Sequence, residues 1–392
     1  MTPIAGLVVL DFTRVLAGPM ATQLLAELGA EVIKVERPRG GDESRQWEPM
    51  LPAGESAYFF AFNRGKRSIT LNLKSPAGQR IARDLARQAD VVVENFLPGD
   101  MAAMGLGYDV LAADNPSLVY VSNTGFGQDG PYRDRKGYDT IFQALSGVMA
   151  LTGHPDAPPA KVGVPFADLT SGLWIAIAVL AGLAGRGVNG RGSHIDVAMM
   201  DAQVSLLTIA AARLFALNQE PTRTGTEHPG RVPSAAFRCR DGLWLHISGS
   251  DQHWAALCTT LGMPHDPALA TNAARVAHRA KIMQAMTSAI ADRDRAPLAE
   301  ALRAADIPAG EVNSVSDILS DPHTQDRQMV GQFEHPTAGI FPALRTPLRE
   351  VGGQPPAIGT PPLLGADTET VLAGRLGLDA AQIAALRAER AI

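Results

Sequence analysis

The sequence predicts an α/β protein: a large domain built on a parallel β-sheet, and a smaller α+β domain. Three observations support this fold class. In the first third of the chain, short apolar runs alternate with helical stretches, which is typical of βαβ units. Aromatic residues make up only 5% of the chain, a composition that favours helices packed on a sheet over an all-β sandwich. The length of 392 residues is also sufficient for two hydrophobic cores.

The first third of the chain contains five predicted strands. Residues 7–12 form a nearly continuous apolar run, as expected for a strand that is buried on both faces. A helix is predicted from Pro19 to Leu28, and Gly29 is expected to end it as a C-terminal cap. Ser75 and Pro76 are predicted to start a second helix that runs to about Gln88. The other predicted strands lie at residues 31–36, 68–73, 91–93 and 118–121.

Helical patterns dominate from about Tyr138 to Leu217. The longest apolar run, Leu173 to Ala184, is shorter than the roughly 20 residues that a membrane span needs, so we interpret it as a buried core helix. Two further strands at residues 235–239 and 243–247 are joined by Arg240-Asp241-Gly242, a plausible hairpin turn.

These patterns divide the chain into three parts. We predict a large domain over residues 1–222, a small α+β domain over residues 223–328, and a tail over residues 329–392 that returns to the large domain. The tail is expected to end in two helices, at residues 368–376 and 380–390.

Composition excludes several classes of function. The net charge of −5 argues against nucleic acid as the main partner, which would require a basic surface. Cys239 and Cys258 form neither a CxxC pair nor a cluster at zinc spacing, so we interpret them as structural thiols in a reducing cytoplasm. The N-terminus lacks the basic segment of an export signal. We therefore expect a cytoplasmic protein with no metal site and no membrane partner.

One glycine motif needs to be weighed. Gly125-Phe126-Gly127-Gln128-Asp129-Gly130 matches G-x-G-x-x-G and follows a strand, as in dinucleotide sites. Such a site needs a helix that begins there and directs its amides toward a pyrophosphate. Pro131-Tyr132-Arg133-Asp134 follows instead, which is turn chemistry. We therefore predict a surface loop.

Several short blocks carry a more specific signal, because their order and spacing combine. Together they resemble the class III CoA-transferase family, which includes formyl-CoA, carnitine and succinyl-CoA:glutarate CoA-transferases. The resemblance runs from about residue 5 to the C-terminus and is weakest between about 220 and 310. The blocks lie at residues 11–19, 28–38, 63–69, 93–99, 136–139, 167–172 and 362–365.

The resemblance implies that Asp168, in the Ala-Asp-Leu block, is the catalytic nucleophile. A carboxylate suits CoA transfer, because it can hold either an acyl group or CoA in turn. From the residues alone, Asp168 could also be the N-cap of the helix that runs through Trp174 and Leu180. A helix N-terminus would lower the pKa of Asp168 and keep it ionised.

The resemblance also implies a set of CoA contacts. Cations in this set suit the phosphates of CoA, and apolar members suit adenine and pantetheine. Solvation at the surface is the alternative for the three cations. No prosthetic group or metal is implied, and CoA enters as a substrate. The matching positions are Val15, Arg37, Leu71, Lys74, Asn95, Phe96, Met104, Lys136 and Tyr138.

Two positions depart from formyl-CoA transferase. Leu16 stands where that enzyme has glutamine, and Ile247-Ser248-Gly249-Ser250 is the nearest counterpart of its tetraglycine loop. The pattern is more similar to members that use succinyl-CoA and dicarboxylates. We therefore expect succinyl-CoA as donor and a dicarboxylic acid as acceptor. The second carboxylate would need a cation, for which the candidates are Arg14, Arg223 and Arg231.

Two other functions remain open. α-Methylacyl-CoA racemases share the fold and use a histidine in the block that reads Gly137-Tyr138-Asp139 here. Tyrosine, with an ordinary pKa near 10, is a poor base at neutral pH, so Tyr138 favours transfer over racemisation. A non-catalytic acyl-CoA-binding protein should lack the nucleophile, and Asp168 is present. The resemblance further implies an interlocked homodimer, with the active site between the large domain of one subunit and the small domain of the other.

Overall fold

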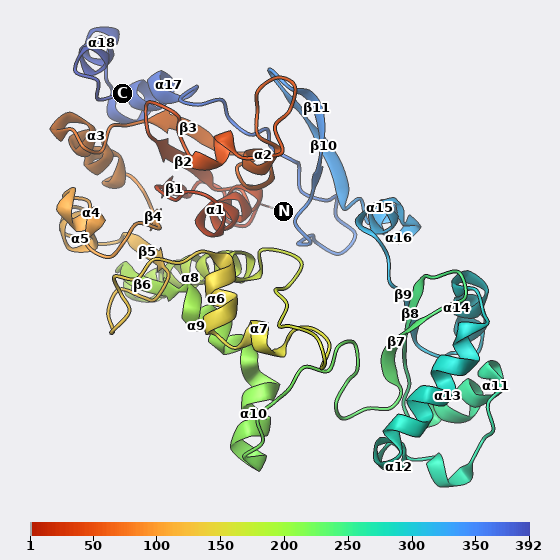
Figure 1. Ribbon diagram of the computed structural model, residues 1–392. Helices are drawn as coiled ribbons and strands as arrows, with labels where there is room; N and C mark the ends of the chain where they lie inside the picture. The colour runs from red at the N-terminus through yellow and green to blue at the C-terminus, as the bar shows by residue number, and fades with distance from the viewer. Residues whose placement is uncertain (1) are drawn as a thin grey trace. The chain divides into compact units, whose positions relative to one another are not determined.

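A six-stranded parallel sheet forms the centre of the first part of the chain in the computed structural model, which describes residues 2–392 (Figure 1). The strand order is β3-β2-β1-β4-β5-β6, and all neighbours run parallel. The predicted parallel α/β sheet is therefore confirmed. The strands are β1 (Val8–Asp11), β2 (Glu31–Glu36), β3 (Arg67–Thr70), β4 (Val91–Glu94), β5 (Val119–Thr124) and β6 (Ser193–Ala198).

Helices cover both faces of this sheet because its strands are apolar on both sides. In β1, Val8 and Leu10 belong to one buried cluster and Val9 to the other, as expected when successive side chains point to opposite faces. One face packs on α1 (Ala17–Glu27) and α8 (Phe166–Asn189). The other packs on α3 (Pro76–Ala86), α4 (Asp100–Ala103), α5 (Tyr108–Asp114), α17 (Thr368–Leu376) and α18 (Ala380–Ala388).

The strand order reverses at β1, which lies between β2 and β4. In open parallel sheets, a crevice forms at such a reversal, outside the carboxyl ends of the strands. The segment after β1 and the segment after β4 therefore border the expected ligand site.

Residue types typical of helix ends correctly predicted where some helices begin or end. Ser75 Oγ accepts a hydrogen bond from the Gly78 amide at 3.0 Å and caps α3, as predicted. Gly29 adopts a φ of +106° just after α1, which confirms its role in ending that helix. The start of α1 differs from the prediction, because the helix begins at Ala17 and Pro19 lies within its first turn.

The strand β6 corrects a sequence prediction, because residues 138–217 were expected to be helical. Gly190 ends α8 with a φ of +70°, and Gly192 then runs against Leu118, where a Cβ atom would lie 1.9 Å from the Leu118 carbonyl oxygen. The chain can therefore pair with β5 from Ser193 onward. The G-x-G-x-x-G segment is a loop, as predicted, because turns follow it up to Asp139.

The apolar helix α8 also differs from the prediction, because only one of its faces is buried. Ile175 and Val179 are fully buried against the sheet, whereas Trp174 is 42% exposed and Ile177 is 51% exposed. By length and composition alone, Phe166–Asn189 and Met199–Leu217 could cross a membrane. The packing of α8 on the sheet is that of a core helix with one uncovered face.

The chain forms two compact units. The first contains the residues up to Val148, Val162–Ala211 and Pro322–Ile392, and the second contains Met149–Lys161 and Ala212–Asp321. The limits at residues 222 and 328 stay a prediction. Further helices of the first unit are α2 (Ala57–Phe62), α6 (Asp139–Leu145), α9 (Met199–Val204) and α16 (Pro322–Asp326), and β10 (Val330–His335) pairs with β11 (Gly339–Leu344).

The second unit contains a three-stranded antiparallel sheet, which confirms the predicted hairpin. The strands β7 (Ser234–Arg238), β8 (Trp244–Ser248) and β9 (Ala309–Glu311) lie in that order. Both cysteines are unpaired and buried in its core. Its helices are α11 (Trp254–Leu261), α12 (Asn272–Ala277), α13 (Arg279–Ala291), α14 (Arg295–Ala304) and α15 (Val315–Ser320); α7 (Val148–Leu151) and α10 (Thr208–Leu217) span the limits between the units.

Candidate active site

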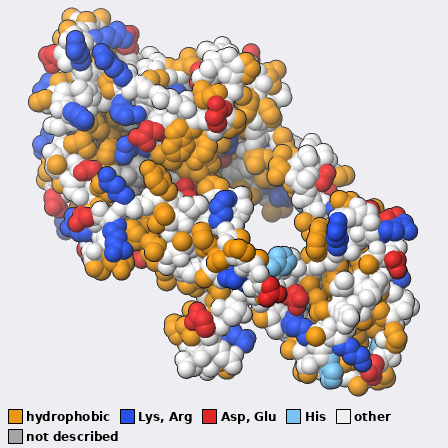
Figure 2. Space-filling model, viewed as in Figure 1, with side chains coloured by type: hydrophobic (Ala, Val, Ile, Leu, Met, Phe, Trp, Pro, Cys, Tyr) orange, Lys and Arg blue, Asp and Glu red, His pale blue; other side chains and the backbone are white. Residues whose placement is uncertain are grey.

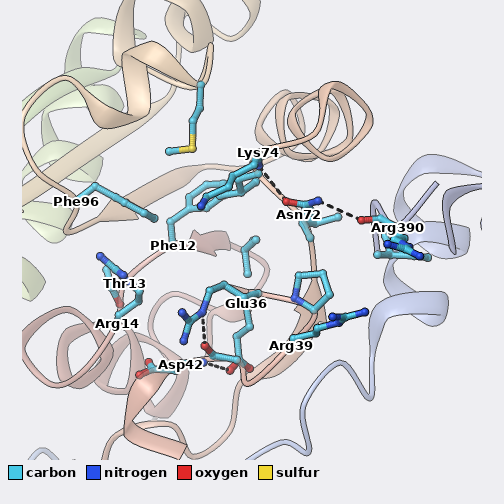
Figure 3. Close-up of a pocket in the computed structure, with 18 of the residues that line it drawn as sticks. Phe12, Thr13, Arg14, Glu36, Arg39, Asp42, Asn72, Lys74, Phe96 and Arg390 are labelled. Atoms are coloured by element: carbon cyan, nitrogen blue, oxygen red, sulfur yellow. Dashed lines mark hydrogen bonds between the residues drawn. The ribbon is translucent and has the colours of Figure 1, made fainter. Parts of the chain in front are cut away.

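A cavity of about 820 Å³ lies at the carboxyl ends of β1, β2, β3 and β4, where the strand order predicts a ligand crevice (Figure 3). We call it the β1–β4 cavity. Its walls combine apolar and cationic side chains. The apolar side chains are Phe12, Val35, Pro38, Leu71, Leu73, Phe96, Met104 and Ile392, and the cationic ones are Arg14, Arg37, Arg39, Lys74, Arg387 and Arg390.

Five of the nine predicted contact residues line this cavity. They come from separate segments that follow β2, β3 and β4, and the fold brings them together at one edge of the sheet. These five are Arg37, Leu71, Lys74, Phe96 and Met104.

Asn95 and Val15 lie beside the cavity and shape the segment after β1. Asn95 accepts a hydrogen bond from the Arg14 amide at 3.0 Å and donates one to the Arg14 carbonyl oxygen at 2.9 Å. The Val15 amide donates to both carboxylate oxygens of Asp42 at 3.2 Å. Val15 has a φ of +72°, which strains a β-branched residue and marks a backbone held in place by its surroundings.

Lys136 and Tyr138 are not part of the cavity wall. They lie in the segment just before α6, and Tyr138 is 79% exposed. Their predicted contact with CoA stays a prediction. The neighbouring residue Asp139, however, contacts the start of α8, so the two segments meet there.

Of the three cations suggested for a second carboxylate, only Arg14 lines the cavity. Its guanidinium stacks on the Phe96 ring at 4.7 Å from the centroid, and one nitrogen pairs with Glu43 at 3.2 Å. Its Nε atom is buried and has no hydrogen-bond partner within residues 2–392. Arg223 and Arg231 belong to the second unit, where Arg223 donates to backbone carbonyl groups, among them that of Ala157.

A buried set of two ion pairs supports the cavity floor. Lys34 Nζ lies 2.9 Å from Asp42 Oδ2, and Lys66 Nζ lies 3.1 Å from Asp11 Oδ2. All four side chains are inaccessible to solvent. Burial alone would raise the pKa of Asp42, but the charge and hydrogen bond of Lys34, together with the hydrogen bonds from Ser44, hold that pKa below its ordinary value. Burial lowers the pKa of Lys66 to about 7 despite the nearby Asp11 carboxylate, so the charge of this second pair depends on pH near neutrality. Lys34 also donates to the Thr13 carbonyl oxygen at 2.9 Å.

Asp168 lies in the first turn of α8 and is not its N-cap. Pro165 occupies the cap position and supplies no side-chain hydrogen bond. The Asp139 carboxylate fills this role instead, because it accepts hydrogen bonds from the amides of Ala167 at 2.7 Å and Asp168 at 3.2 Å. The alternative interpretation of Asp168 as the capping residue is therefore wrong.

The electrostatic surroundings of Asp168 also correct an expectation. Burial, followed by the nearby Asp139 carboxylate, raises the pKa of Asp168 to about 7. The helix N-terminus does not outweigh these two effects. Asp168 is thus a half-buried carboxyl group that exchanges its proton near neutral pH.

Asp168 is not part of the wall of the β1–β4 cavity, and two observations place the start of α8 near it. One turn further along α8, Gly172 packs on α1 so closely that a Cβ atom would lie 2.9 Å from the Ala17 carbonyl oxygen. Tyr58 provides the second link, because burial and then the charges of Asp168, Asp42 and Asp139 raise its pKa to about 12. Asp42 lines the β1–β4 cavity. The start of α8 therefore borders the segment that follows β1.

Sequence reasoning missed Asp139 and Tyr58 as parts of this site. Asp139 lies in the block Lys136-Gly137-Tyr138-Asp139, so the block itself was the available signal. No comparable signal identifies Tyr58. Tyr58 interacts electrostatically with Asp139 and Asp168, which lie more than 80 positions further along the sequence, and with Asp42, which is closer in sequence. Only the folded chain brings these groups together.

Comparison with known proteins gives one family. The family described as "CoA-transferase family III" matches residues 4–368 of this chain. The chain belongs to this family. The protein is therefore a CoA-transferase.

Individual relatives agree with this assignment. The chain is 40% identical to "Succinyl-CoA:glutarate CoA-transferase" of Mus musculus, over 95% of this chain and 86% of the relative. It is also 40% identical to "Succinate--glutarate CoA-transferase" of Agrobacterium fabrum, over 88% and 89%. A crystal structure of a CAIB/BAIF family protein from Brucella suis matches with a TM-score of 0.85 and 39% identity, over 95% of this chain and 99% of that one.

No group of three or more His, Cys, Asp or Glu side chains placed to hold a metal ion occurs within residues 2–392. The cations and apolar walls of the β1–β4 cavity fit a phosphorylated nucleotide with an aromatic base. CoA, the substrate of this family, is such a molecule.

Proposed function

We propose that this CoA-transferase takes CoA from succinyl-CoA, passes it to a dicarboxylic acid, and carries the transfer on Asp168. The observation that carries the proposal is the half-buried Asp168 carboxyl group beside a cavity that suits CoA. The names of the two similar transferases from mouse and Agrobacterium fabrum support the choice of donor and acceptor.

The reaction divides into two symmetrical halves. An Asp168 carboxylate oxygen attacks the thioester carbon, the C–S bond breaks, and CoA leaves as a thiolate with a mixed anhydride behind it. The thiolate then attacks Asp168 Cγ, which forms an aspartyl-CoA thioester and releases the first acid as its carboxylate. The acceptor carboxylate reverses both steps and regenerates Asp168. No proton and no water is consumed.

The surroundings of Asp168 suit these steps. A carboxylate with a raised pKa is more basic and therefore a stronger nucleophile, and at pH 7 about half of it is ionised. Burial limits the access of water, which would hydrolyse the anhydride. Each attack forms an oxyanion, and we propose that amides in the first turn of α1 stabilise it, since this turn packs against α8.

We propose the β1–β4 cavity as the CoA site and Arg14 as the cation for the second carboxylate. Phe96 and Met104 would contact the pantetheine, Leu71 the base, and Arg37 and Lys74 the phosphates. Arg14 retains an unpartnered, buried Nε donor. A buried donor of this kind gains more from an anionic partner than a solvated one does.

The assembly is part of the proposal. Leu173, Trp174, Ile177 and Leu180 leave one side of α8 exposed, and α10 contains no buried residue. An apolar surface of this kind on a metabolic enzyme favours a protein partner, and we propose that the partner is a second copy in an interlocked homodimer. A cytoplasmic location, without nucleic acid or membrane partners, completes the proposal.

Mass spectrometry of the trapped intermediate tests the covalent mechanism. The protein is incubated with succinyl-CoA, treated with hydroxylamine or borohydride, and digested. We expect the modification on the peptide that contains Asp168, and a loss of transfer activity of at least about 10³-fold in Asp168→Ala. The exposed Asp129→Ala variant is the matched control and should retain activity.

Each other outcome has a separate meaning. An adduct with a different acyl-CoA, but not with succinyl-CoA, would keep the mechanism and overturn the donor. Full transfer activity in Asp168→Ala would overturn the mechanism. Absence of any adduct, together with deuterium exchange at the α-carbon of an acyl-CoA, would show racemase chemistry, which Tyr138 in place of histidine argues against.

A further inference from the structure

The C-terminal tail reaches the β1–β4 cavity from the far end of the sequence. The Asn72 amide donates to the Ala391 carbonyl oxygen at 2.8 Å, and the Asn72 side chain donates to the Arg390 carbonyl oxygen at 3.3 Å. Leu386 of α18 and Ala391 belong to the buried core of the sheet. The tail is therefore anchored beside the segment that follows β3, two residues from Lys74.

Anchoring places two further arginines on the cavity wall. Arg387 lies in the last turn of α18 and Arg390 just after it, and both line the cavity. Figure 3 shows Arg390 at the cavity edge. In the space-filling view, Lys and Arg side chains gather over the region of α18 and α3 (Figure 2). The tail thus adds positive charge to a rim that already carries Arg39 and Lys74.

This positive charge is largely uncompensated. Within residues 2–392, no ion pair is formed by Arg390, Arg39 or Lys74, and Arg387 pairs only with the exposed Glu369. The two acids on the cavity wall are already neutralised, because Glu36 pairs with Arg45 at 2.7 Å and Asp42 pairs with Lys34 at 2.9 Å. Several cations with no anion between them repel one another, and a bound dianion would relieve that repulsion.

The position of the tail relative to Asp168 indicates which anion this is. Arg14, Phe96 and Asp42 lie on one side of the cavity in the close-up, and Arg39 and Arg390 lie on the opposite side (Figure 3). The start of α8, with Asp168, borders the side of Asp42. In an acyl-CoA, the thioester is at one end and the 3′-phosphate of the adenosine is at the other. A thioester at Asp168 therefore directs the nucleotide end toward the tail.

We infer that Arg387 and Arg390 of the C-terminal tail bind the 3′-phosphate of CoA, together with Arg39 and Lys74 of the same rim. The inference rests on the proposed CoA site and extends it. The match to CoA-transferase family III ends at residue 368, so both arginines lie outside the matched region. Their place on the cavity wall comes from the structure of this chain.

Substitutions that remove charge but keep the side chain long provide the test. Binding of CoA and of 3′-dephospho-CoA is measured by titration calorimetry for the wild type and for the double variant Arg387→Gln/Arg390→Gln. We expect the Kd of CoA to rise about tenfold in the double variant, which corresponds to the loss of one or two charge-assisted contacts. The Kd of 3′-dephospho-CoA should change less than twofold.

Two control variants separate this inference from the site on which it rests. Arg303→Gln removes an exposed arginine of α14, in the second unit, and should bind both ligands as the wild type does. Lys74→Gln removes a cation of the proposed CoA site itself and should weaken CoA binding. Circular dichroism confirms that each variant is folded, because the tail also packs on the core.

The outcomes are distinct. If the Kd values of CoA and 3′-dephospho-CoA rise by the same factor in the double variant, the arginines act elsewhere on the ligand and the assignment to the 3′-phosphate is wrong. If the double variant binds CoA as the wild type does while Lys74→Gln is weakened, the cavity is correct and the tail is not part of it. If neither Lys74→Gln nor the double variant affects CoA binding, the proposed CoA site itself is wrong.

Discussion

Two regions of the first unit that bury carboxylates affect the pKa of those carboxylates in opposite ways. Beneath the segment after β1, Asp11 and Asp42 each lie within about 3 Å of a lysine, and the pKa of each carboxyl group is held below its ordinary value. At the start of α8, Asp168 has no cation partner within residues 2–392 and lies near Asp139. Its pKa is raised to about 7.

The difference separates a structural acid from a reactive one. A buried carboxylate that is paired with a lysine is stabilised as a charge and has little tendency to attack a carbonyl group. A carboxylate that is buried near another acid holds its charge at a cost, and it gains when that charge is consumed in a covalent bond. The paired acids therefore support the fold, whereas Asp168 keeps a carboxyl group available for chemistry. Lack of a cation does not by itself identify a reactive acid, because burial also raises the pKa of Glu94, which forms no ion pair within residues 2–392, to about 7.

The largest expected effect comes from removing one lysine of the buried ion pairs. Lys34→Met leaves Asp42 buried without its cation, and we expect the free energy of unfolding to fall by about 3–5 kcal/mol. Urea denaturation followed by circular dichroism measures this change. Lys281→Met, on the exposed side of α13, is the control and should change stability by less than about 0.5 kcal/mol. A similar small loss for Lys34→Met would show that the pair has no structural role.

A smaller effect is expected when Asp139, the second acid near Asp168, is replaced. Burial and Asp139 together raise the pKa of Asp168, so Asp139→Asn should lower that pKa while keeping an oxygen that accepts from the Ala167 and Asp168 amides. The ionised carboxylate is the nucleophile, and transfer activity is therefore present above the pKa and lost as the pH falls through about 7 in the wild type.

The pH profile of the transfer rate at saturating donor measures this shift. We expect the midpoint of the profile to move to lower pH in Asp139→Asn, whereas the exposed Asp129→Asn control keeps the wild-type midpoint. An unchanged midpoint in Asp139→Asn would mean that the charge of Asp139 does not act on Asp168, and the contrast between the two regions would then rest on burial alone.

The smallest effect concerns stability. The folded-state pKa of Asp168, about 7, lies above its ordinary value of 3.8, so folding favours the protonated form and the wild type loses stability as the pH rises between these values. Asp168→Asn cannot ionise, and its melting temperature should exceed that of the wild type by about 2–4 °C at pH 8. The difference should shrink at pH 5, where Asp168 is protonated. A difference that is independent of pH would contradict the raised pKa.

Sequence patterns predicted much of this fold because the relevant forces are local. Apolar runs such as Val8–Asp11 and Val91–Glu94 are buried on both faces and can be recognised one strand at a time. The strand Ser193–Ala198 was missed because its burial is partial and its pairing with β5 is long-range. Leu118, against which Gly192 packs, is 74 positions away.

The candidate site likewise has features that the sequence predicted and features that it could not predict. The resemblance to the class III family implied Asp168 as the nucleophile and five residues that line the cavity wall. The motif blocks could not indicate that Asp139 caps α8, because that contact joins segments 28 positions apart through a side chain. Nor could they predict the direction of the pKa shift of Asp168, since a helix N-terminus and burial act in opposite directions and only the degree of burial decides between them.

The sequence by itself determined the parallel α/β architecture, which depends on periodicity, and the family to which the chain is similar. The resemblance to that family implied Asp168 as the candidate nucleophile. The tertiary structure alone decided which charges are paired, which buried carboxylates are left without a cation, and that Arg387 and Arg390 meet Lys74 at one cavity. The physical reason is that burial and electrostatic interaction depend on distance in space, and the fold brings together residues that lie more than 300 positions apart in the chain.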